Sequence, residues 1–147
     1  LHNGDFMTAS GRLDNRAAGM YLLAAGMIWK KNAADAKDTQ GAYLVGRYSS
    51  TAEAISFVDQ QITVAAVWMG TCASRKSDSI GVAYTFADVT GKDGGAISEA
   101  SEQVLELYYR AEVTPFFAIT PDIQYIANPG GNFGDAVLFA VRFVLDF

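Results

Sequence analysis

The chain has very few of the residues on which small disulfide scaffolds, zinc sites and catalytic triads depend. Its 147 residues include one cysteine and one histidine. Because Cys72 is the single cysteine, an internal disulfide and a cysteine-based zinc site are excluded, and we expect a free thiol in a polar turn. His2 lies in a polar opening segment, so we expect neither a Ser/His/Asp triad nor a histidine-based metal site.

Long hydrophobic runs are also absent. No segment approaches the roughly 18 consecutive apolar residues of a membrane helix. If the chain lies in a membrane it must therefore do so as a β-barrel, because only helices and closed barrels satisfy their backbone polar groups in lipid. The 50% hydrophobic content would equally suit a soluble domain.

Positive charge is scarce as well, and the formal net charge is -5. This acidic balance argues against a nucleic-acid partner, which normally requires a basic patch. No signal peptide precedes Leu1, so we expect either a mature start here or a missing N-terminal part of a longer chain.

The most informative stretch is the last one, Ala136 to Phe147, which reads AVLFAVRFVLDF. Every second residue is large and apolar, and this period of two is that of a β-strand. The other face is mixed and carries two charges, Arg142 and Asp146. About eleven residues is the length that a tilted strand needs to cross a bilayer. The pattern predicts a transmembrane strand with a lipid face and a polar lumen face.

Six further segments have strand-like patterns, and polar turns separate them. The segment from Ala17 to Trp29 is ambiguous, because its Ala, Leu and Met residues also favour a helix. As a strand it would place Tyr21, Leu23, Ala25, Met27 and Trp29 on one face. The predicted segments are Ala17–Trp29, Gly41–Ser50, Val58–Gly70, Ser79–Ala87, Glu102–Val113 and Phe116–Ala127.

Seven strands in hairpin order predict an all-β, antiparallel fold. Seven is an odd number, whereas bacterial single-chain barrels close with an even one. We therefore expect the C-terminal portion of a larger barrel in residues 17–147, with residues 1–16 a loop or the end of a preceding strand.

The residues of the final third resemble those of a known family. LELYYRAEVTPFFAITPDIQYIANPGGN (Leu105 to Asn132), followed by DAVLFAVRFVLDF, resembles the C-terminal end of the carbohydrate-selective porins of Gram-negative outer membranes, the OprB type. GMYLLAAGMIWK, GAYLVGRYSS and ITVAAVWMG are similar to the preceding strands of that family, in the same order. The resemblance favours a strand rather than a helix at Ala17–Trp29.

The resemblance implies a water-filled barrel of roughly 16 strands that passes small sugars. It implies an outer-membrane location in contact with lipid, no catalysis and no cofactor, and leaves a homo-oligomer possible. If the C-terminus is periplasmic, as is usual for such barrels, Trp29 and Trp68 fall at periplasmic strand ends, where an aromatic girdle is expected.

In this barrel the mixed faces of the strands would line the channel. Carboxylates, guanidiniums and amides can exchange hydrogen bonds with sugar hydroxyls, and a tyrosine ring can stack on a pyranose. A purely structural role remains open for each, most of all for Arg110 beside Glu106 or Glu112. The candidate pore-lining or sugar-contact residues are Glu106, Tyr108, Arg110, Asp122, Gln124, Arg142 and Arg47.

Two alternatives remain open. A soluble β-sandwich or barrel that binds a ligand would share the alternation, but its apolar face would pack against another sheet. A general diffusion porin would share the barrel and lack a sugar site. GKDGG at 91–95 lacks the spacing of a phosphate-binding loop, and residues 128–135 lack the spacing of a calcium-binding EF-hand loop.

Overall fold

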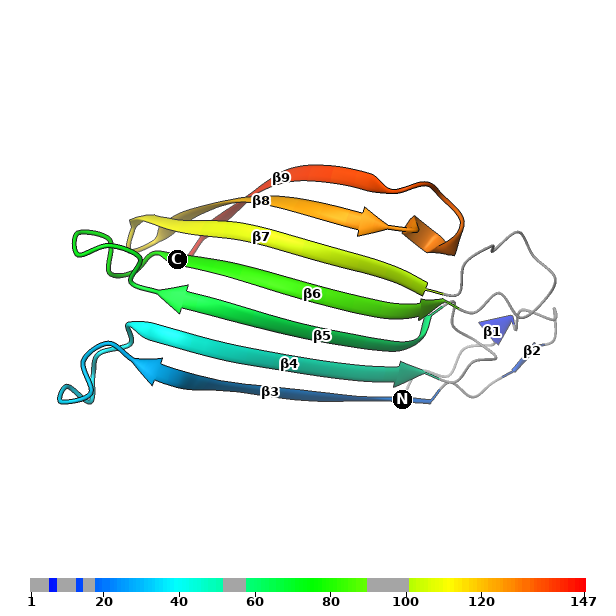
Figure 1. Ribbon diagram of the computed structural model, residues 1–147, viewed down its shortest axis with the longest axis horizontal. Coiled ribbons are helices and arrows are strands. Elements are labelled where there is room, and N and C mark those ends of the chain that lie inside the picture. Colours follow the sequence, from blue (N-terminus) through cyan, green and yellow to red (C-terminus); the bar gives the residue numbers. More distant parts are fainter. Residues whose placement is uncertain (1–5, 8–12, 15–17, 52–57, 90–100) are drawn as a thin grey trace.

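The computed structural model describes residues 6–7, 13–14, 18–51, 58–89 and 101–147. Seven strands form one antiparallel sheet in which each strand pairs with the next along the chain. Figure 1 shows this sheet as a single layer. The strands are β3 (Gly19–Lys30), β4 (Gly41–Thr51), β5 (Val58–Met69), β6 (Ser79–Val89), β7 (Ser101–Thr114), β8 (Phe117–Ala127) and β9 (Ala136–Leu145).

Three short elements complete the described structure. β1 (Phe6–Met7) and β2 (Leu13–Asp14) pair with each other in a separate sheet, within the segment expected to be a loop or strand end. A 3-10 helix, η1 (Pro129–Gly131), lies in the turn between β8 and β9. No helix in the described part of the chain has the length and apolar character needed to cross a membrane.

The sheet has almost no conventional core. Among the described residues only Ala87, Val89 and Ala118 are buried hydrophobic residues. The described residues also form no second sheet that could cover the seven strands. The β-sandwich alternative requires such a layer, so the arrangement of these residues argues against it.

One face of the sheet, the apolar face, consists mostly of exposed hydrophobic side chains. The strand register shows which residues lie on this face. For example, five residues that pair in succession across β5 to β9 form one row on it. All five side chains of that row are 45–58% exposed. A continuous exposed apolar surface of this kind is typical of contact with a membrane or a partner. The row consists of Val64, Tyr84, Leu105, Tyr125 and Val137.

A β-bulge in β3 corrects one sequence-based prediction. The uninterrupted alternation placed Trp29 on the face of Tyr21 and Met27. In the structure the register with β4 shifts between Met27 and Trp29, which leaves Ile28 as the extra residue. Trp29 pairs with Ala42 and therefore lies on the apolar face, opposite to Met27. A bulge adds one residue to one strand only, so a period-two count cannot detect it.

Pro121 interrupts the pairing of β8 with β7. Tyr108 pairs with Asp122, and the next pair along the strands is Ala111 with Ile119. The pairing is thus interrupted at the two positions between them, while the register is the same on both sides of the gap. Proline has no N–H group to donate to the ladder, which accounts for the gap. The other edge of β8 keeps its pairing, and Pro121 lies opposite Val141.

The two ends of the sheet differ in the segments that they carry. The C-terminal end, where β9 finishes, carries segments 31–40, 70–78 and 115–116. The opposite end carries segments 52–57, 90–100 and 128–135, of which the first two lie outside the described residues. Figure 1 shows the C-terminus beside the first set.

Candidate functional site

The second face of the sheet, the mixed face, brings most of the predicted site residues together. Glu106 and Tyr108 of β7 pair with Gln124 and Asp122 of β8. Arg142 of β9 pairs with Thr120, two residues along β8 from Asp122. We call the set on β7, β8 and β9 the polar strip; its members are Glu106, Tyr108, Arg110, Asp122, Gln124 and Arg142.

Arg47 lies on the same face but apart from the polar strip. It belongs to β4 and pairs with Thr63 of β5, so β5 and β6 separate it from β7. Three strand spacings amount to about 14 Å along the sheet. The structure therefore does not bring Arg47 next to the other six candidates.

Some members of the polar strip are held by neighbours. Gln124 donates from Nε2 to Oδ1 of Asp122 at 3.1 Å, and Asp122 is only 7% exposed. Arg110 forms an ion pair with Glu112 at 3.5 Å, one of the two pairings expected for it. These contacts orient Asp122 and Arg110 within the wall.

Other members remain available for a solute. Glu106 and Arg142 form no ion pair with any described residue. The Tyr108 hydroxyl likewise has no hydrogen-bond partner in the described part of the chain. The polar strip thus combines a fixed carboxylate–amide pair with groups that can form new hydrogen bonds.

The mixed face of β6, next to the polar strip, is built from small residues. Gly81 lies opposite Tyr108, and Ala83 lies opposite Glu106. Thr85, the next residue on this face, shares a 2.9 Å hydrogen bond with Thr63 of β5. Small side chains here leave room for the large ones of β7.

Two tryptophans stack on the apolar face at the C-terminal end. Trp29 and Trp68 pair with the same residue, Ala42, from its two sides. Their ring centroids are 5.1 Å apart and the rings are inclined by 22°. Amphipathic indole rings at one end of an apolar band are typical of a membrane-interface girdle.

Three tyrosines on the apolar face form hydrogen bonds near the opposite end of the sheet. Tyr48 donates to Gln60 at 3.4 Å, and Tyr84 donates to Gln103 at 2.8 Å. Tyr125 donates to Asp135, the residue just before β9. Rings in an apolar band with hydroxyls turned toward polar groups suit the second interface of a membrane.

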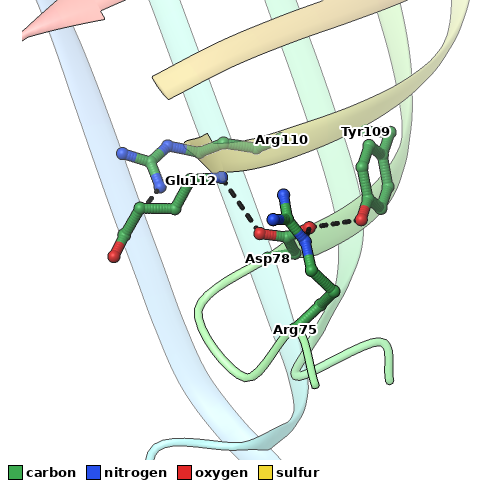
Figure 2. A network of polar contacts seen from close by, with 5 residues as sticks. All are labelled: Arg75, Asp78, Tyr109, Arg110 and Glu112. Carbon is green, nitrogen blue, oxygen red and sulfur yellow. Dashed lines mark hydrogen bonds and ion pairs between the residues drawn. The ribbon is translucent and has the colours of Figure 1, made fainter. Parts of the chain in front are cut away.

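A buried carboxylate organises the start of β6 and the end of β7. Asp78 precedes β6 and is 1% exposed. It accepts hydrogen bonds from Arg75 Nε at 2.6 Å, from the backbone N–H of Glu112 at 3.0 Å, and from the Tyr109 hydroxyl. Figure 2 shows Asp78 between these groups. The carboxylate thus joins the 70–78 turn to β7.

The three donors determine how Asp78 ionises. Burial by itself opposes the charged form, but hydrogen bonds from Tyr109, Arg75 and Glu112 outweigh it. The pKa of Asp78 is therefore lowered from its usual value. The same contact with Asp78 raises the pKa of Arg75.

The Asp78 cluster was not predicted from the sequence. Asp78 is the last residue of the polar stretch TCASRKSD, where an aspartate is expected on composition alone. Tyr109 is 31 positions away, so only the register of β6 and β7 identifies the pair. Cys72, in the same turn, is an exposed free thiol, as predicted. GKDGG and His2 lie outside the described residues.

Comparison with known proteins identifies the family. The model of the carbohydrate-selective porin, OprB family matches residues 3–147. The high pH structure of Pseudomonas putida OprB superposes with a TM-score of 0.73 at 21% identity, over 95% of this chain. The chain spans 40% of that protein, so its seven strands correspond to part of a larger barrel. Comparison with curated protein sequences found no match. The chain therefore belongs to the carbohydrate-selective porin, OprB family of Gram-negative outer-membrane porins.

Proposed function

We propose that this chain forms part of the wall of a water-filled channel for passive diffusion of sugars. The observation that carries the proposal is the segregation of the two faces in a chain of this family. The apolar face is largely exposed, whereas the polar strip collects charged, amide and phenol groups on the other side of the same strands. A barrel wall has this division, with lipid outside and water inside.

The polar strip has the chemistry needed to pass a neutral sugar. Each sugar hydroxyl both donates and accepts a hydrogen bond. Asp122 and Glu106 offer acceptors, Arg142 offers donors, and Gln124 offers both. Passage requires binding that is strong enough to admit the solute and weak enough to release it. Scattered groups that exchange hydrogen bonds one at a time meet that requirement better than one tight site.

The proposed orientation has the C-terminal end in the periplasm. The Trp29–Trp68 stack would then lie in the periplasmic girdle and the hydroxyls of Tyr48, Tyr84 and Tyr125 near the external interface. Outer-membrane lipids are the proposed surroundings of the apolar face.

The test is single-channel conductance of the full-length protein in a planar bilayer, titrated with a neutral monosaccharide. A conductance that falls and saturates as sugar is added supports a channel with a carbohydrate site. An ionic conductance that sugar leaves unchanged would indicate a general diffusion porin instead. A water-soluble monomer without any conductance would contradict the membrane proposal.

A further inference from the structure

Gly81, the third residue of β6, occupies an unusual position beneath the ring of Tyr108. The two residues are cross-strand partners on the mixed face. A Cβ atom added to Gly81 would lie 2.3 Å from Cε1, 2.4 Å from Cζ and 2.5 Å from the hydroxyl oxygen of Tyr108. The far end of the ring thus fills the space that any other residue would use for its Cβ.

This contact defines how the Tyr108 side chain lies. Tyr108 has Gly81 on one side and Asp122 of β8 on the other. Side chains in a strand normally stand roughly perpendicular to the sheet. Because the end of this ring reaches Gly81, the ring must instead lie along the wall, across β6 and away from Asp122. Packing of an aromatic ring over a cross-strand glycine is a known way to stabilise such a site.

Backbone geometry does not explain the glycine. Among the described residues, the glycines with positive φ are Gly41, Gly70, Gly130 and Gly131, and Gly81 is not one of them. Glycines within other strands do not have such a contact. A Cβ added to Gly26 or Gly46 would meet no atom within 4 Å. The close approach of the Tyr108 ring is what sets Gly81 apart.

We propose that Gly81 is a positioning residue that holds the Tyr108 ring flat against the channel wall and so keeps the lumen wide beside the polar strip. The consequence for the lumen rests on the proposed function. A flat ring leaves the exposed Arg142 side chain accessible and presents its own face and free hydroxyl to a passing solute. Among the described residues, Glu106, Arg142 and Arg110 are the charged groups that act electrostatically on that hydroxyl.

The test substitutes Gly81→Ala in the full-length protein. The added methyl group displaces the ring, and the displaced atoms are at the far end of a side chain that can rotate, so the barrel is expected to fold. The ring then stands away from the wall, and the expected result is a loss of single-channel conductance. Gly46→Ala, a mid-strand glycine with open space around its Cα, is the matched control and keeps the wild-type conductance.

A double variant makes the test specific for the ring. In a Tyr108→Ala background, Gly81→Ala is expected to have no further effect on conductance, because no ring remains to displace. If Gly81→Ala alone assembles poorly, normal assembly of the double variant supports the same conclusion. Wild-type conductance in Gly81→Ala, or an equal loss with and without the ring, would overturn the proposal. The readout is ionic conductance without sugar, so a failure of sugar block in the wild type would reject the sugar function separately.

Discussion

At the residue scale, Asp122 and Arg142 are charged members of the polar strip on adjacent strands. We predict that Asp122→Ala and Arg142→Ala each weaken the block of the channel by a neutral sugar. One lost hydrogen bond to a charged group is worth about 1.5–3 kcal/mol, which corresponds to roughly a tenfold or greater rise in the sugar dissociation constant. Sugar titration of single-channel conductance measures the change.

Asp146 provides the matched control for Asp122. It is an exposed aspartate that follows β9, so Asp146→Ala removes the same charge without touching the polar strip. The dissociation constant of this control is expected to equal that of the wild type. Sugar block that is unchanged in both polar-strip variants would assign those residues a structural role only.

Asp78 carries a second prediction at this scale. Asp78→Ala removes the acceptor of three hydrogen bonds and leaves the Tyr109 hydroxyl and the Glu112 N–H without their partner. Breaking a buried charged pair typically costs about 3–5 kcal/mol, and part of that loss is expected here because Arg75 is partly exposed. Urea unfolding in lipid vesicles measures the free energy. A loss no greater than that of Asp146→Ala would contradict the role given to the cluster.

At the element scale, the 70–78 turn depends on the ionised form of Asp78. Because the folded state lowers the pKa of this carboxyl, its contribution is complete above the unfolded pKa of about 3.9. The contribution is lost as the pH falls through the lower, folded pKa. The stability difference between the wild type and Asp78→Asn should therefore be largest near neutral pH and shrink below about pH 4. A difference that is constant from pH 7 to pH 3 would contradict this account.

The bulge in β3 gives another prediction about an element. Since Ile28 is the extra residue, Trp29 should face lipid together with Trp68. The difference in fluorescence between Trp68→Phe and the double variant Trp29→Phe/Trp68→Phe isolates the emission of Trp29. We predict quenching of that emission by brominated lipids and little quenching by aqueous iodide. The reverse result would place Trp29 in the lumen and exclude the bulge.

The strands differ in how much of their structure could be predicted from the sequence. The faces of β9, and those of β7 as far as Glu112, were predicted residue by residue, because an apolar period of two persists along these segments. Val113 was predicted on the apolar face by the same alternation, but it is the extra residue where the β7–β8 register shifts between Glu112 and Thr114. The face of Trp29 was predicted wrongly, since the alternation is broken by one extra residue that carries no local signal. The cross-strand partners Gly81 and Tyr108 could not be predicted either, because register depends on pairing between strands.

At the scale of the whole molecule, family membership and the seven-stranded sheet support one arrangement of lipid and water around the chain. The edges of the described sheet are β3 and β9, and the chain spans 40% of the matched porin. The proposed sugar passage would be a property of the complete barrel. The face assignment, by contrast, can be tested along a single strand.

The most direct test is water accessibility along β7 of the full-length protein in lipid vesicles. Single cysteines replace consecutive residues from Leu105 to Arg110 in a Cys72→Ser background, and a membrane-impermeant thiol reagent probes each one. We predict a period of two, with labelling at 106, 108 and 110 and protection at 105, 107 and 109. Labelling of the odd positions with protection of the even ones, or uniform labelling, would contradict the assignment of the polar strip to the channel lumen.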